Sequence, residues 1–268
     1  MTEEEIQEEQ AIEDASKLTA KTVYEVIRRA GDEELERSNG SLFWSGVSAG
    51  IVISFSVLGE AVLRTYLPDT SYSYLIENLG YCLGFVMVII GRMQLFTENT
   101  ITTVLPFLHS PSWSVFNRIL VLWSIVLFAN VLGAFAIATF YAHSGAISAE
   151  LLPAIEELSR HATGMPPAES FARAIPAGIL VAAIVWMLPE AGASSVSIIV
   201  LFTWLIAAGD FTHIVAGSVE MAYLMVTGDL GLQQAAFGFF LPVLAGNVVG
   251  GTVIFAMLAW GQVRRDID

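Results

Sequence analysis

The sequence predicts an all-α membrane protein with six transmembrane helices, arranged as inverted 3+3 repeats and including two broken helices. Of the 268 residues, 55% are hydrophobic and only 14% are charged, whereas about a quarter of the residues in soluble domains are charged. The apolar residues are gathered in uncharged blocks, such as residues 42–59, 119–149 and 230–263. Polar interruptions also recur at matching positions in the two halves of the chain, which is typical of inverted-repeat transporters.

The uncharged blocks set the expected spans. A helix needs about 20 apolar residues to cross the hydrocarbon core, and its backbone hydrogen bonds must be satisfied within the helix. Six stretches meet this length, at about residues 42–65, 79–108, 117–143, 170–189, 195–227 and 235–260. The polar stretch 144–170 predicts an extramembrane excursion with a short helix, ended by Pro166 and Pro167.

The N-terminal segment is acidic. Residues 1–38 contain 12 acidic and 5 basic side chains. This balance argues against nucleic-acid binding and against a secretory signal peptide. Residues 15–38 predict an amphipathic helix at the membrane surface, and residues 1–12 predict a partly disordered tail. The expected division is a cytoplasmic segment at 1–40, a channel domain at 41–262 and a tail at 263–268.

The basic residues predict the orientation. Five of them precede the first span, and Arg264 and Arg265 follow the last one. Because Lys and Arg accumulate on the cytoplasmic side, both termini are expected in the cytoplasm.

The second and fifth spans are interrupted by GRMQLFTENT (Gly91–Thr100) and AAGDFTHIVAG (Ala207–Gly217). Such breaks at membrane depth point to a binding site between two repeats. The third and sixth spans share an Asn-x-x-Gly element, at Asn130–Gly133 and Asn247–Gly250. Small residues allow two helices to pack closely, and a buried Asn can form hydrogen bonds between them.

Ionisable residues inside a membrane are costly and usually face a protein interior or a water-filled path. Here they are Glu60, Arg92, Glu98, Asp210, His213 and Glu220. His213 is a candidate proton carrier, since histidine titrates near neutral pH; a helix-terminal histidine bonded to a backbone carbonyl is the alternative. Thr97 suits either a helix N-cap or a pore-lining role beside an anion.

The carboxylates allow two interpretations. Arg92, Glu98, Asp210 and Glu220 can form an ion-pair network that holds the broken helices together. If they instead face the conduit, they favour cations or neutral solutes. For Glu60 the alternative is a helix or subunit interface.

Soluble-enzyme motifs are absent: the chain has no HExxH, no GxSxG and no phosphate-binding glycine loop, and its four histidines lack ligand spacing. Neither an enzyme activity nor a metal or other cofactor is expected, and the lone Cys82 is expected to pack in the core.

Two segments resemble a known family. Leu79–Thr100 is similar to the second helix of the formate/nitrite transporters, with Leu95, Phe96 and Thr97 matching its Leu-Phe-Thr motif. Gly209–Ser218 is similar to the family's fifth helix, where a central His precedes a Val-Ala pair, here Val215 and Ala216. The Asn-x-x-Gly elements also occur in the family at these places. The resemblance covers roughly residues 40–260.

The resemblance implies a homopentamer of aquaporin-like protomers in the bacterial inner membrane, each with its own pore. Small monovalent anions such as formate or nitrite pass two apolar constrictions in this family. His213 and Thr97 then line the path, and the constrictions fall at Tyr81 and Ile206.

The chain departs from the family in two places, which indicates a divergent, YfdC-like branch. Residues 160–173 lack the usual lysine, and residues 178–186 lack the usual asparagine. The first hypothesis is therefore a passive or proton-coupled anion conduit. The second is a pore of the same fold for a neutral or cationic solute. The third is a membrane scaffold whose acidic N-terminus binds a cytosolic partner.

Overall fold

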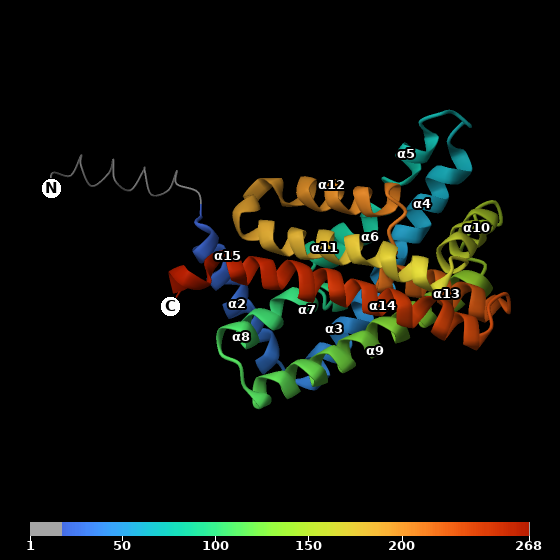
Figure 1. Cartoon of the computed structure of the whole chain (residues 1–268). Helices are drawn as coiled ribbons and strands as arrows, with labels where there is room; N and C mark the ends of the chain where they lie inside the picture. The colour runs from blue at the N-terminus through green and yellow to red at the C-terminus, as the bar shows by residue number, and fades with distance from the viewer. Residues whose placement is uncertain (1–17, 268) are drawn as a thin grey trace.

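The structure is a computed structural model and describes residues 18–267, in which every regular element is a helix. The elements before the polar stretch 144–170 are α2 (Ala20–Glu36), α3 (Asn39–Val52), α4 (Ser54–Tyr66), α5 (Ser73–Glu77), α6 (Cys82–Ile90), α7 (Phe96–Thr102), α8 (Val104–His109) and α9 (Trp113–His143). The remaining elements are α10 (Leu152–Thr163), α11 (Pro167–Ala191), η1 (Gly192–Ser194), α12 (Ser195–Ala208), α13 (Ile214–Thr227), η2 (Gln234–Phe240), α14 (Leu241–Val248), η3 (Val249–Ala256) and α15 (Met257–Ile267). The long helices run roughly along one axis (Figure 1).

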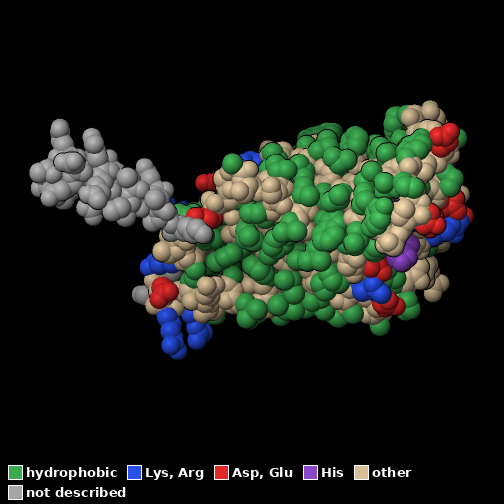
Figure 2. Space-filling view, turned by 90° about the horizontal axis from the view of Figure 1, so that it is seen from above, with side chains coloured by type: hydrophobic (Ala, Val, Ile, Leu, Met, Phe, Trp, Pro, Cys, Tyr) green, Lys and Arg blue, Asp and Glu red, His purple; other side chains and the backbone are tan. Residues whose placement is uncertain are grey.

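Five helical stretches are long and apolar enough to cross a membrane, and a shorter apolar helix adds Ile214–Thr227. The five are Asn39–Tyr66, Ser73–Ile90, Trp113–His143, Pro167–Ala208 and Gln234–Asp266. Figure 2 shows apolar side chains over the middle of the molecule, with charged side chains gathered at its two ends. Large apolar side chains such as Phe128, Leu201 and Leu258 are more than half exposed. This outward apolar belt is the surface that a bilayer requires.

The predicted helix breaks are present and are shorter than expected. The first spans residues 91–95, between α6 and α7, and the second spans residues 209–213, between α12 and α13. In each break a glycine is followed by a residue with positive φ: Arg92 at 50° and Asp210 at 55°. A non-glycine residue rarely adopts this left-handed conformation, so the chain turns out of the helix in the same strained way twice.

Two buried asparagines anchor the breaks with the same three hydrogen bonds. The Asn130 side chain accepts from Phe96 N–H at 3.0 Å and donates to the carbonyls of Gly46 at 2.8 Å and Gln94 at 2.9 Å. The Asn247 side chain accepts from Ile214 N–H at 2.8 Å. It also donates to the carbonyls of Ala174 at 2.8 Å and Thr212 at 3.0 Å. Each asparagine thus fixes the first residue of a half-helix.

The helices that carry these asparagines pack against glycines. A Cβ atom on Gly50 would lie 2.1 Å from the Asn130 carbonyl oxygen, and one on Gly178 would lie 2.3 Å from that of Asn247. Gly133 and Gly250 likewise press against backbone atoms of α3 and α11. The predicted packing role of both Asn-x-x-Gly elements is therefore visible in the described residues.

The segments outside the spans lie at opposite ends of the molecule (Figure 1). The amphipathic helix is α2, which packs against α15 at one end, where Lys21 Nζ donates to the Asp266 carbonyl. Residues 1–17 of the predicted N-terminal segment lie outside the described residues. At the other end α10 is the expected short helix, and Arg64 of α4 pairs with Glu157 of α10 at 3.4 Å.

Candidate functional site: a buried histidine between two cavities

The two half-helices α7 and α13 begin side by side in the centre of the molecule. His213 Nε2 lies 2.8 Å from Thr97 Oγ1, and both side chains are buried. The two residues are 116 positions apart, so the break in each half supplies one of them. The structure therefore brings together the two residues that the sequence singled out most strongly.

The second ring nitrogen of His213 is also engaged. Nδ1 accepts from Ala216 N–H at 3.3 Å and caps α13. Because Nδ1 accepts, the neutral tautomer carries its proton on Nε2 and donates it to Thr97 Oγ1. The alternative for this histidine, a bond to a backbone carbonyl, is not formed among the described residues. Its ring instead meets Phe85 edge-on, with centroids 4.9 Å apart.

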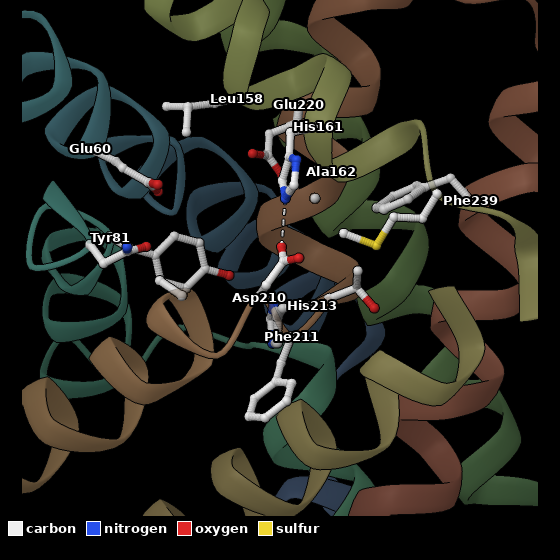
Figure 3. Close-up of a pocket in the computed structure, with 15 residues that line it drawn as sticks. Glu60, Tyr81, Leu158, His161, Ala162, Asp210, Phe211, His213, Glu220 and Phe239 are labelled. Atoms are coloured by element: carbon white, nitrogen blue, oxygen red, sulfur yellow. Dashed lines mark hydrogen bonds and ion pairs between the residues drawn. The ribbon is translucent and has the colours of Figure 1, made fainter. Parts of the chain in front are cut away.

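A cavity of about 70 Å³ leads to His213 from the end of the molecule that carries α10. We call it the acidic cavity, because Glu60, Asp210 and Glu220 line it together with Tyr81 and His213. Figure 3 shows the Glu60 and Glu220 carboxyl groups and the Tyr81 hydroxyl directed into this space. The cavity brings α4, α10 and α13 to one site, together with Tyr81, which directly precedes α6.

At the rim of the acidic cavity, Asp210 is held by the side chains of Arg173 and His161. Arg173 Nη1 donates to Asp210 Oδ2 at 2.5 Å, and His161 Nε2 lies 2.8 Å from Asp210 Oδ1. Arg173 also pairs with Glu169 at 2.8 Å. Neither Arg173 nor His161 belonged to the predicted site, since both precede the break by 37 residues or more in the sequence.

A larger cavity of about 760 Å³ opens at the other end, beneath α2. We call it the inner vestibule. Arg92, Gln94 and Leu95 line it from the first break, Glu98 lines it from α7, and Glu34 lines it from α2. Gln94 Nε2 donates to Glu34 Oε2 at 2.7 Å, which ties α2 to the break. Glu98 Oε1 is buried and has no hydrogen-bond partner among residues 18–267.

The predicted ion-pair network of Arg92, Glu98, Asp210 and Glu220 is wrong for the described residues. Arg92 and Glu98 line the inner vestibule, whereas Asp210 and Glu220 line the acidic cavity. The sequence places an Arg and an Asp at equivalent points of the two breaks, but the breaks face opposite ends of the molecule. Their charges therefore cannot meet.

The four apolar or aromatic site candidates fall into two groups. Tyr81 lines the acidic cavity and Leu95 lines the inner vestibule. Ile206 and Phe96 are fully packed in the core and border neither cavity, and Phe96 meets Trp123 edge-on at 5.6 Å between centroids. Glu60 is a lining residue that the sequence showed only as an ionisable group in a span.

Comparison with known proteins agrees with this architecture. The model of the formate/nitrite transporter family matches residues 21–261. The inner membrane protein YfdC of Escherichia coli K12 is 42% identical over 256 residues, which cover 96% of this chain and 83% of that protein. The formate channel FocA of Haemophilus influenzae Rd is 24% identical, with 79% of this chain and 82% of that protein covered.

Two solved structures share the fold. A pentameric formate channel with formate bound superposes with a TM-score of 0.71 at 22% identity, covering 84% of this chain and 98% of the channel. An ion channel of the FNT family gives a TM-score of 0.76 at 18% identity, covering 90% of this chain and 98% of the channel. With a family match over nearly all of the described residues and a relative at 42% identity, the chain belongs to the formate/nitrite transporter family of integral membrane proteins.

Proposed function

We propose that the chain is a transmembrane channel or transporter for small monovalent anions such as formate or nitrite, located in the bacterial inner membrane. The observation that carries this proposal is the pair of cavities on opposite sides of one buried contact, His213–Thr97. A solute that crosses between them must pass the start of two half-helices, whose backbone N–H groups and positive dipole ends favour an anion.

Within this path the predicted roles are distinct. His213 and Thr97 provide the polar centre. Tyr81 and Leu95 act as the narrow points towards the two ends, because each is buried and borders a cavity. Ile206, which is fully buried near the end of α12, stays a proposed constriction residue. Such short apolar barriers keep the two aqueous cavities apart when no solute is passing.

The proposed topology has six spans in inverted 3+3 repeats, with residues 41–262 as one channel domain and both termini in the cytoplasm. It is supported by equivalent contacts in the two halves, above all the matching hydrogen bonds of Asn130 and Asn247. In it, α6 with α7 and α8 forms the second span, and α12 with α13 forms the fifth.

A homopentamer is proposed as the assembly, since one of the solved channels of this fold is pentameric. In an assembly of aquaporin-like protomers, each subunit contains its own path. The acidic cavity and the inner vestibule of one subunit then form the two ends of one path.

A second candidate function is passage of a neutral or cationic solute through the same path. It is favoured by the composition of the acidic cavity, where Glu60 and Glu220 border the path, and by the absence of lysine after residue 21. Ionised carboxylates at this point would repel an anion and attract a cation.

Ion flux into proteoliposomes separates the two functions. The purified protein is reconstituted, and uptake of radiolabelled formate and nitrite is compared with uptake of potassium and ammonium, with protein-free liposomes as the baseline. The proposal predicts protein-dependent uptake of the anions and none of potassium. Uptake of potassium or ammonium without anion uptake would show that the second candidate function is the correct one.

A further inference from the structure

The acidic cavity contains two carboxyl groups that the described residues leave unpaired. Glu60 lies on α4 with 9% of its surface exposed, and Glu220 lies on α13. No hydrogen bond or salt bridge joins either carboxyl group to another side chain or to the backbone within residues 18–267. Figure 3 shows Glu60 of α4 and Glu220 of α13 both pointing into the cavity.

The neighbouring charges are already neutralised by other partners. Arg64, one turn after Glu60 on α4, donates to Glu77 of α5 at 2.8 Å. Arg173 of α11 is bound to Asp210 and Glu169. The remaining titratable groups near the pair come from the elements packed around it, namely Tyr81 just before α6, Cys82 of α6, Glu157 and His161 of α10, Tyr223 of α13 and His213.

An unpaired carboxylate is costly in such a place. Burial away from water disfavours the ionised form unless a cation or several donors compensate it. Two carboxylates that border one small cavity also repel each other. A protonated carboxyl group avoids both costs and has an O–H group that can donate a hydrogen bond. The surroundings therefore favour the protonated form of each side chain.

His213 is poorly placed to hold that proton itself. Nδ1 accepts the N-cap bond from Ala216 and Nε2 is bonded to Thr97. A second proton would have to sit on Nδ1 and would break the cap of α13. The imidazole is therefore a fixed neutral hydrogen-bond donor at the centre of the path. A proton that is transferred to the solute has to come from another side chain.

We propose that Glu60 and Glu220 form the proton-loading site of the path. This inference rests on the proposed anion transport. A weak-acid anion that enters the acidic cavity takes the proton of one carboxylic acid: the O–H bond of the side chain breaks, an O–H bond forms on the anion, and a carboxylate remains. The neutral acid then passes the buried His213–Thr97 contact. A hydronium ion at the mouth of the cavity then gives a proton back to the carboxylate and leaves a water molecule.

The site also explains how a lysine-free path accepts an anion. While both carboxyl groups are protonated, the remaining carboxylate of the cavity wall is Asp210, which is paired with Arg173, and an anion can enter. When they are ionised, the cavity repels it. Uptake from this side is therefore expected to fall as the pH rises, and each anion that crosses is expected to bring one proton with it.

The test uses the full chain in proteoliposomes, with Glu60→Gln, Glu220→Gln and the double variant. Glutamine keeps the size and a hydrogen-bond donor but has no proton to give. Radiolabelled formate uptake is measured at pH 5 and pH 7.5, and proton uptake is followed with a dye inside the liposomes. Glu150→Gln, at an exposed position before α10, is the matched control, and Glu220→Asp retains an acid. Size-exclusion profiles identify any variant that does not fold.

The wild type, Glu150→Gln and Glu220→Asp are expected to take up formate together with protons, and more strongly at pH 5. The double variant is expected to lose most of the proton signal and to show similar formate uptake at both pH values. A folded double variant with the wild-type pH profile and proton signal would overturn the inference while leaving the proposed function intact. A wild type that takes up no formate or nitrite would overturn the proposed function itself. Potassium uptake that disappears in the double variant would show a cation site instead.

Discussion

At the scale of single residues, His213 is held on both sides of its ring. The N–H group of Ala216 occupies Nδ1 and the hydroxyl of Thr97 occupies Nε2. The sequence identified His213 and Thr97 as candidates because each lies in a helix break. It could not show that they touch, since the contact depends on where two distant breaks meet in the folded chain.

The Thr97 hydroxyl is expected to stabilise the folded protein through this contact. Thr97→Val keeps the shape of the side chain but leaves the buried imidazole N–H without its acceptor, which costs about 1–3 kcal/mol. Unfolding in mixed detergent micelles should show this loss. Thr97→Ser keeps the hydroxyl and is the matched control. If valine and serine have equal effects, the hydrogen bond does not support the centre of the path.

Glu60 illustrates what the sequence leaves open at this scale. An acidic residue within an apolar span suggests a protein-facing position, but it does not distinguish a helix interface from a cavity. That distinction needs the positions of α10 and α13, which pack against α4 only in the folded chain. The sequence does not identify Arg173 and His161 as site residues for the same reason, because their partner Asp210 is distant in the sequence.

At the scale of helices and their connections, the two asparagines act as anchors. Asn247→Leu removes the acceptor of Ile214 N–H and the donors to two carbonyls. At about 1–3 kcal/mol for each unsatisfied buried group, the sum approaches the whole stability of a typical domain. We expect little folded protein after purification.

The matched control is Asn78→Leu, because that buried side chain donates one hydrogen bond, to the Tyr74 carbonyl at 2.6 Å. It should reduce stability far less than Asn247→Leu. Equal yields and equal resistance to unfolding for the two variants would contradict the anchoring role of Asn247.

The helix α2 carries a pH-dependent cluster outside the spans. Hydrogen bonds from Arg28 and Arg29 lower the pKa of Glu25 to about 2. Because this pKa is depressed on folding, the stabilisation is complete above the unfolded value of about 4.3 and is lost as the pH falls towards 2. Intrinsic-rate-corrected hydrogen exchange of α2 amides should therefore accelerate between pH 4 and pH 2.

The same measurement on Glu25→Gln provides the comparison. This variant has no carboxylate to protonate, so the exchange of α2 should change less over that range. An identical acceleration in both proteins would mean that the protonation of groups other than Glu25 causes the faster exchange of α2.

Element by element, the sequence predicts the long apolar stretches and both breaks, because charge-free blocks and their polar interruptions are local patterns. It predicts the short helix α10 for the same reason. It misplaces the charges around the breaks, because the opposite directions of the two half-helices decide which charges meet. The break lengths were also overestimated, since Thr97–Thr100 and Ile214–Gly217 are helical despite their polar neighbours.

At the scale of the whole molecule, the proposed topology predicts which loops face each side of the membrane. Cys82 is buried, so single cysteines can be introduced at exposed positions and tested with a membrane-impermeant maleimide. Ser110→Cys and Ala193→Cys should react only from the cytoplasmic side, and Asp69→Cys and Ala149→Cys only from the other side. The unaltered chain is the control and should stay unlabelled.

Labelling of Ser110→Cys and Asp69→Cys from the same side would contradict the broken second span, and with it the six-span arrangement. The long helices and the apolar belt of the molecule would still require a bilayer, but the two cavities would then not face opposite compartments.

The central claim is that small anions cross the membrane past His213. The most direct test is radiolabelled formate and nitrite uptake into proteoliposomes at pH 5 and pH 7.5, with the wild type, His213→Ala and the exposed-residue control His143→Ala. We predict wild-type and His143→Ala uptake that is greater at pH 5. His213→Ala should fall by roughly tenfold, which corresponds to about 1.4 kcal/mol in the barrier. Wild-type uptake that equals the protein-free baseline, or His213→Ala uptake equal to the wild type, would contradict the account.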